Sequence, residues 1–244
     1  MRVIASLGAF GYLLWRVLGT LRYVWTDRRR VWFQLDHVGV RSVPLVGLIG
    51  FFAGAIVAWQ GAYQFKGMVS LSVLGGQVVR VLMMEMGPVL TALVISGRIG
   101  ASMAAEIGTM KVTEQIDALR TMSIDPVRYI VLPRMVGLGV MMPVLTIFAT
   151  VVAVGGSYLV SNYFLDVTQQ VYFNSVREFF LLQDLMGGLI KGMVFGLIIA
   201  LVSCFQGLQT SLGASGVGAA TISAFVICAV AVLAGDFLLW IILF

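Results

Sequence analysis

Long stretches without a single charged residue constrain this chain more than any other feature of its sequence. Arg41 and Lys66 enclose 24 uncharged residues, and Arg134 and Asp166 enclose 31. A helix needs about 20 apolar residues to cross the hydrocarbon core of a bilayer, so each stretch is long enough. Charged residues make up only 11% of the 244 residues, which excludes a soluble globular domain, a disordered chain and a disulfide-stapled secreted module. The sequence therefore predicts an all-α integral membrane protein.

Five segments are expected to cross the membrane as helices. These predicted spans are 43–64, 73–107, 135–160, 185–209 and 218–244. The second span is long, rich in glycine and carries four charges, so we expect protein rather than lipid around it. Glycines spaced four residues apart in the first and fourth spans favour close helix packing, although chance matches are expected in a chain with 28 glycines.

The N-terminal segment, residues 1–30, is expected to form an amphipathic helix that lies in the membrane interface. Its apolar residues recur at helical spacing from Val3 to Trp25, while its arginines lie elsewhere on the helical wheel. The charged run 27–30 is expected to end this helix. The alternative is that residues 1–25 form a short additional span.

The distribution of basic residues predicts the orientation in the membrane. Residues 1–41 hold seven arginines and residues 108–134 hold four basic residues, whereas the loops 65–72 and 161–184 hold one each. Cytoplasmic loops carry the excess of lysine and arginine. We therefore expect a cytoplasmic N-terminus, a cytoplasmic 108–134 loop and, with five spans, a C-terminus on the opposite side.

Three charged residues lie inside predicted spans where no loop can take them: Glu85, Lys191 and Asp236. A charge at the bilayer centre costs about 2.5–3.5 kcal/mol on insertion scales and is tolerated beside a partner or a watery cavity. The topology gives the three residues overlapping depths in the outer half of the membrane, which predicts a polar cluster. Two compatible roles stay open: a salt bridge that holds three helices together, or the lining of a cavity for an amphiphile head group or an ion.

Arg98 and Glu106 form a second pair of charges in the second span. They are eight residues apart, about two helical turns, and small residues surround them. Because small residues let another backbone approach closely, we expect both charges to tie this span to neighbouring helices near the cytoplasmic surface.

Residues 109–123 are expected to form a short amphipathic helix between the second and third spans. Thr109 is a candidate cap, and the dipeptide Asp125-Pro126 is expected to end the helix. The apolar stripe consists of Val112, Ile116, Leu119 and Met122. The helix either rests on the lipid surface or docks a cytoplasmic partner, and its mixed charge favours a protein partner, since membrane-surface helices are mainly basic.

Residue types needed for common chemistry are scarce. His37 is the single histidine, and Cys204 and Cys228 are two thiols in apolar runs, so a zinc site and a catalytic triad are not expected. No lysine lies in a phosphate-binding Gly-Lys-Ser/Thr loop, so ATP-driven transport would require a separate ATPase subunit.

The segment from Gly87 to Arg134 resembles the signature of the MlaE/YrbE-type ABC permeases, and the resemblance continues in 142–146, 189–197 and 232–239. It implies a single permease domain over 1–244 with an N-terminal interfacial helix and five spans. It further implies a homodimer in the bacterial inner membrane, with its N-terminus in the cytoplasm and its C-terminus in the periplasm.

The same resemblance implies the partners and the cargo. Cytoplasmic ATPase subunits would carry ATP and magnesium, so no cofactor is expected in this chain. A periplasmic hexameric MCE-domain protein and, in many systems, a STAS-domain subunit complete the complex, and no nucleic acid is involved. The family moves phospholipids between the inner membrane and the outer envelope.

The resemblance also assigns roles to residues. The ATPase would engage a coupling helix over 109–123, whose expected contact residues are Lys111, Glu114, Gln115, Asp117, Leu119 and Arg120. Glu85, Lys191 and Asp236 match polar positions of the family. Some relatives carry an arginine directly before the glutamate, where this chain has Met84, and we expect Arg80, one turn earlier, to replace it in the cluster.

Two other functions fit parts of the sequence. An ion-coupled secondary transporter would use the three membrane charges as titrating relays and would need no ATPase, but five spans show no obvious inverted repeat. A lipid-modifying membrane enzyme would need clustered histidine, aspartate or cysteine near one interface, and the single histidine argues against it.

Overall fold

The computed structural model describes residues 2–64, 73–211 and 213–243, and in these ranges every regular element is a helix. Five helical segments are long and apolar enough to cross a membrane, which confirms the predicted fold class. Their bounds are Arg28–Gln64, Leu74–Val112, Val127–Phe164, Leu182–Leu208 and Ala214–Leu243. The expected loop 65–72 and the final residue of the fifth predicted span lie outside the described residues.

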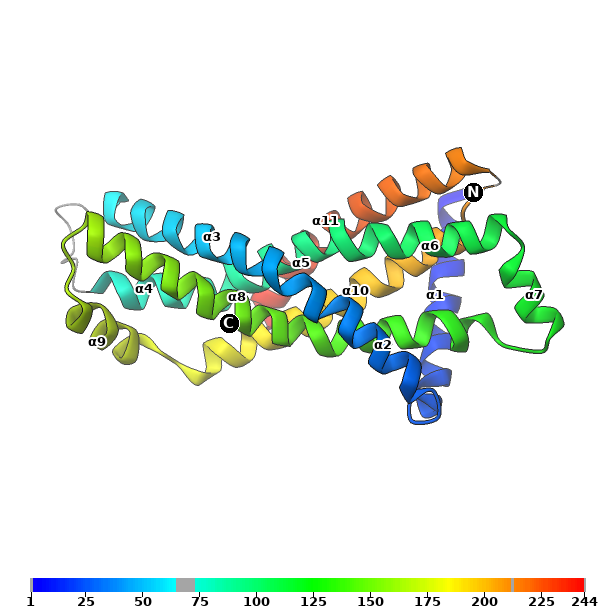
Figure 1. Cartoon of the computed structure of the whole chain (residues 1–244), viewed down its shortest axis with the longest axis horizontal. Coiled ribbons are helices and arrows are strands. Elements are labelled where there is room, and N and C mark those ends of the chain that lie inside the picture. Colours follow the sequence, from blue (N-terminus) through cyan, green and yellow to red (C-terminus); the bar gives the residue numbers. More distant parts are fainter. Residues whose placement is uncertain (1, 65–72, 212, 244) are drawn as a thin grey trace.

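The N-terminal helix α1 (Arg2–Thr20) crosses the long axis of the molecule, whereas the long helices run along it (Figure 1). This is the direction expected of a helix that lies in the membrane surface, since a span would run with the bundle. The short helix η1 (Leu21–Tyr23) and a turn follow, and then α2 (Arg28–Val38) begins.

The charged run after α1 behaves differently from the prediction, because its arginines begin α2 and do not end the first helix. The physical reason is the acid that precedes them. Asp27 accepts hydrogen bonds from Arg30 at 3.3 Å and from Arg128 at 2.8 Å, which fixes it at the start of α2. The helix η2 (Val40–Ser42) then leads directly into the first span, α3 (Val43–Gln64).

The second span is one helical rod that changes its winding twice. Its elements are α4 (Leu74–Val81), η4 (Leu82–Met86), α5 (Gly87–Ile95), η5 (Ser96–Gly100) and α6 (Ala101–Val112). η4 and η5 are π-helical turns, and each contains a charged residue of the predicted set. The first turn adjoins Pro88, which has no amide hydrogen, and the Gly87 amide donates to Leu82 O, five residues back.

The third span joins η6 (Val127–Val131) to the 33-residue helix α8 (Leu132–Phe164), which packs closely along α3. Glycines make this approach possible, because a Cβ at Gly54 would collide with the backbone of Ala153 and a Cβ at Gly156 with that of Phe51. The core lies between α5, α6, α8 and the fourth span, α10 (Leu182–Leu208).

A short helix, α9 (Gln169–Phe179), lies in the segment expected to be only a loop. Tyr172 is completely buried, and the amide of Gly76 on α4 donates to Ser175 Oγ at 3.0 Å. The sequence did not reveal α9, because the helix is too short to cross a membrane and its burial depends on contacts with α4. α9 and the short helix α7 (Gln115–Thr121) lie at opposite ends of the molecule (Figure 1).

The fifth span, α11 (Ala214–Leu243), starts at the end that carries α7 and finishes near the middle of the long axis (Figure 1). Only 11% of its most apolar window is buried. Most of α11 therefore faces outward, toward lipid or another chain.

The helix expected over 109–123 is divided between two elements. α6 continues through Thr109 to Val112, and α7 covers only Gln115–Thr121. Thr109 does not cap a new helix, because no residue breaks α6 before it and its hydroxyl donates to Ala105 O at 2.9 Å. The break comes at Glu114, which adopts the left-handed conformation with φ 60°.

Candidate functional site

Three helices meet at Lys191, whose side chain on α10 is completely buried. Its ammonium donates to Glu85 Oε1 at 3.2 Å and to Asp236 Oδ1 at 2.8 Å. Glu85 comes from the π-helical turn η4 and Asp236 from α11. The structure thus brings together the three predicted membrane charges in one ionic cluster.

The three side chains of the cluster differ in how much of each is exposed. Lys191 has no exposed side-chain surface, while the side chains of Asp236 and Glu85 are 17% and 32% exposed. The ring of Trp240, one turn after Asp236, lies 5.1 Å from the ammonium and adds a cation–π contact. The two acidic side chains are therefore partly accessible from outside, whereas the lysine is enclosed.

Arg80 was expected in this cluster, but its ion pair is with a different residue. Its Nε donates to Asp184 Oδ2 at 2.8 Å, which joins α4 to the first turn of α10. The Asp184 side chain is only 4% exposed. Because a buried carboxylate is costly without a positive partner, Asp184 favours this position of the Arg80 guanidinium. Sequence reasoning missed Asp184 because it lies just before the predicted fourth span, where a polar residue is unremarkable. A carboxylate in the first turn also suits the helix dipole.

Arg98 and Glu106 each tie the second span to a different neighbour. Arg98 Nη1 donates to Ser42 Oγ at 2.6 Å, and Ser42 is buried at the junction of α2 and α3. Glu106 Oε2 accepts from Arg134 Nη2 at 2.9 Å at the start of α8. The sequence did not reveal these partners, since Ser42 and Arg134 are distant along the chain.

The residues expected to meet an ATPase divide into two groups. Glu114, Gln115, Asp117 and Arg120 are exposed on and beside α7. Leu119, in contrast, packs against the core. Lys111 is turned inward, because its ammonium donates to Leu208 O at 2.7 Å and so caps the last turn of α10. The end of α6, just before α7, is therefore connected to the fourth span.

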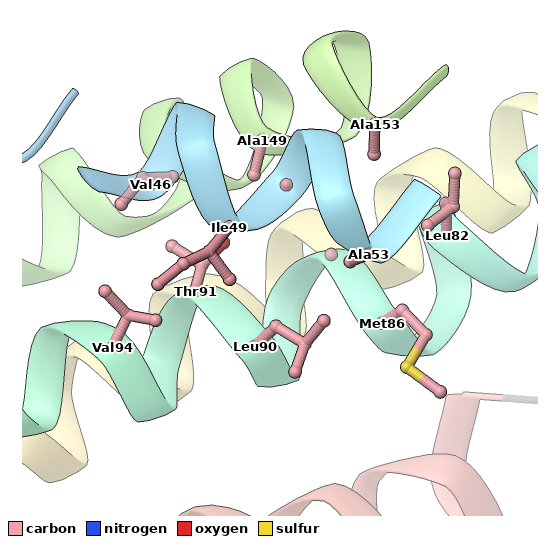
Figure 2. A pocket seen from close by; sticks show the side chains of 12 residues that line it. Val46, Ile49, Ala53, Leu82, Met86, Leu90, Thr91, Val94, Ala149 and Ala153 are labelled. Carbon is pink, nitrogen blue, oxygen red and sulfur yellow. The ribbon is translucent and has the colours of Figure 1, made fainter. Parts of the chain in front are cut away.

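A narrow apolar cleft lies between α3, α8 and the η4–α5 segment (Figure 2). Leu82, Met86, Leu90 and Val94 line it from the second span, one turn apart. Among the described residues that line the cleft, Thr91 has the only polar side chain, and its buried hydroxyl oxygen has no hydrogen-bond partner among them. Sequence reasoning missed the cleft because it depends on how three helices pack.

Comparison with known proteins identifies the class of protein. The family model described as Permease MlaE matches residues 31–242. The chain belongs to the MlaE permease family. The resemblance inferred from the sequence motifs is thereby confirmed.

Relatives of this MlaE-family permease support the same assignment. A probable ABC transporter permease protein of Rickettsia typhi is 42% identical, over 86% of this chain and 82% of the relative. A probable ABC transporter permease protein of Synechocystis sp. is 38% identical, over 87% and 81%. The Arabidopsis thaliana chloroplastic protein TRIGALACTOSYLDIACYLGLYCEROL 1 is 34% identical, over 84% of this chain and 59% of the relative.

These findings establish the MlaE-family permease as a multi-pass membrane subunit of an ABC transporter, which works with ATPase partner subunits. The permease relatives support a role in transport. Among the described residues, no three His, Cys, Asp or Glu side chains lie close enough together to hold a metal ion.

Proposed function

We propose that two copies of this chain form the membrane part of an ATP-driven transporter that moves phospholipids between the inner membrane and the outer envelope. The observation that carries the proposal is the buried Lys191, held between Glu85 and Asp236, together with the apolar cleft lined by Met86, the residue after Glu85. A polar group and apolar walls together match an amphiphile. The name of the Arabidopsis relative also refers to a lipid, trigalactosyldiacylglycerol.

Each part of the site would take one part of the lipid. The aliphatic side chains that line the cleft, together with Met86, would contact acyl-chain carbons. The ionic cluster would meet the head group. Because its partly exposed side chains are the acidic Glu85 and Asp236, the cationic amine of a zwitterionic head group suits it better than a bare phosphate.

ATP hydrolysis would act on the site through α7. A partner ATPase that binds the exposed Glu114 and Asp117 would push on α7 when it closes around ATP. The movement would pass along the continuous helical rod Leu74–Val112, which carries Glu85. It would also pass through the Lys111–Leu208 hydrogen bond into α10, which carries Lys191.

The same proposal gives the arrangement of the subunits in the complex. α7 and the N-terminus would lie in the cytoplasm with the ATPases and a STAS-domain subunit, and α9 would face the periplasmic MCE-domain hexamer. The outward apolar face of α11 supports contact with lipid or a second copy.

The experiment is lipid transfer from proteoliposomes that contain the chain and its co-purified ATPase, measured with ATP and with a non-hydrolysable analogue. We expect transfer only with ATP, and we expect Asp236→Asn to abolish it. Arg177→Gln, which changes an exposed charge on α9, serves as the control. Purification without any ATPase, together with transport driven by a proton gradient, would replace this proposal with the ion-coupled transporter.

A further inference from the structure

A second pocket, separate from the cleft and the ionic cluster, lies where α2 meets the end of α6 and the start of the third span. Its volume is about 590 Å³. Its lining residues are Arg29, Arg30, Phe33, Gln34, Met110, Tyr129, Ile130, Pro133 and Arg134. Three of these side chains are guanidinium groups, and none is acidic.

The positive charge of this pocket is only partly compensated. Arg29 has no ion-pair or hydrogen-bond partner in the part of the chain that the structure describes. Arg30 lies over the ring of Tyr129, with its guanidinium carbon 3.7 Å from the ring centroid. It also shares the single carboxylate of Asp27 with Arg128. The pocket therefore retains net positive charge.

Arg134 supplies the second observation that points to a ligand in this pocket. It is about nine-tenths buried, with Nη1 donating to Ile130 O and Nη2 to Glu106 Oε2. Its Nε is buried and has no hydrogen-bond partner. A buried donor without a partner is costly, and arginine forks match phosphate oxygens well.

The surroundings of the pocket indicate where the phosphate comes from. Trp25 and Trp32 flank the arginines along the chain and are 86% and 70% exposed, and Phe33 on the pocket wall is exposed as well. Exposed tryptophans beside arginines are typical of the level where lipid head groups meet water. α1 crosses the bundle at the same end (Figure 1), as expected of a helix at this level.

We infer that this pocket, which we name the α2 pocket, binds the phosphate of an anionic phospholipid from the leaflet at that end of the molecule. The guanidinium groups of Arg29, Arg30 and Arg134 hold the phosphate, and Met110, Ile130 and Pro133 contact the glycerol and the first acyl carbons. Such a lipid connects α2 to the α6–α8 region. It is a resident lipid at a second site and not the transported molecule.

Native mass spectrometry of the full-length protein in detergent tests the inference. The protein is delipidated and then given phosphatidylglycerol or phosphatidylcholine with the same acyl chains. We expect retained phosphatidylglycerol adducts on the unaltered protein and about tenfold weaker retention in Arg29→Gln/Arg30→Gln, because charge-assisted hydrogen bonds are lost. The matched control is Arg28→Gln/Arg41→Gln, which removes the same charge from exposed positions that do not line the pocket.

Four results would overturn the inference. The first two are equal retention of both lipids by the unaltered protein and an equal loss of retention in the control variant. The third is displacement of the lipid by excess inorganic phosphate, which indicates a free-anion site. The fourth is loss of ATPase binding instead of lipid binding in the double variant, which indicates a protein contact. If the double variant does not fold, Arg29→Gln alone decides, since Arg29 forms no ion pair with any residue that the structure describes.

Discussion

The ammonium of Lys191 and the carboxylate of Asp236 are 2.8 Å apart, and Lys191 has no exposed side-chain surface. The contact joins the fourth and fifth spans at a depth where an unpaired charge is costly. Because Glu85 also reaches the same ammonium from the second span, one buried cation connects three helices that are distant in sequence.

Removing one member of this cluster is expected to destabilise the protein more than removing all three charges. Asp236→Asn removes one of the two carboxylates that compensate the charge of Lys191. It should lower the free energy of unfolding by at most about 3–5 kcal/mol, measured by thermal unfolding in detergent. The triple variant Glu85→Gln/Lys191→Met/Asp236→Asn should recover much of that stability and yet fail to transport lipid. Normal transport by the triple variant would contradict the head-group role.

The ion pair between Arg80 and Asp184 should be detectable in a double-mutant cycle. Arg80→Met leaves the buried Asp184 carboxylate without its partner, so we expect a loss of about 1–3 kcal/mol of unfolding free energy. Adding Asp184→Asn should restore part of this unfolding free energy, since the uncompensated charge of Asp184 disappears. Simple additivity of the two changes would mean that the pair contributes nothing.

Glycine contacts between α3 and α8 should be sensitive to a single methyl group. A Cβ at Gly54 meets the backbone of Ala153, so Gly54→Ala should cost about 1–3 kcal/mol and lower the unfolding temperature. Gly155→Ala on the neighbouring helix is the matched control, because a Cβ there meets nothing within 4 Å. Equal effects of the two variants would show that α3 and α8 are not packed this closely.

Charge reversal on α7 should uncouple the ATPase from the permease. Asp117→Lys places a cation on the exposed face and should reduce lipid-stimulated ATP hydrolysis about tenfold, which corresponds to an interface contact of about 1.4 kcal/mol. Glu178→Lys, exposed on α9 at the opposite end, should leave hydrolysis unchanged. Unaltered stimulation in the α7 variant would remove this helix from the coupling path.

The attachment of α9 should weaken in alkaline solution. Burial raises the pKa of the Tyr172 hydroxyl above its ordinary value of 10.0, and the hydroxyl shares a 2.5 Å hydrogen bond with Ser157. Since the folded state holds this proton more tightly, the stabilisation is complete below pH 10 and is lost as the pH rises through the higher folded pKa. Tyr172→Phe should lose roughly 1 kcal/mol at neutral pH and show a smaller alkaline decrease in unfolding temperature. An identical alkaline decrease in both proteins would assign it to other groups.

Much of the fold was readable from the sequence because lipid imposes a simple rule. A segment that crosses the bilayer must be apolar and must satisfy its own backbone hydrogen bonds, so uncharged runs such as 135–160 report spans directly. The sequence motifs between Gly87 and Arg134 also indicated the family. The helix over 109–123 was placed wrongly at its start because no local signal marks the left-handed Glu114, and α9 was missed because its burial depends on α4.

The sequence by itself determined the class of protein, the number of spans and the three charges that must be compensated. Only the tertiary structure decided which charges meet: Lys191 with Glu85 and Asp236, but Arg80 with Asp184. The physical reason is that partners across helices depend on rotation and tilt, which the π-helical turns alter and which periodicity within one helix does not report. The apolar cleft and the α2 pocket likewise exist only because separate helices pack together.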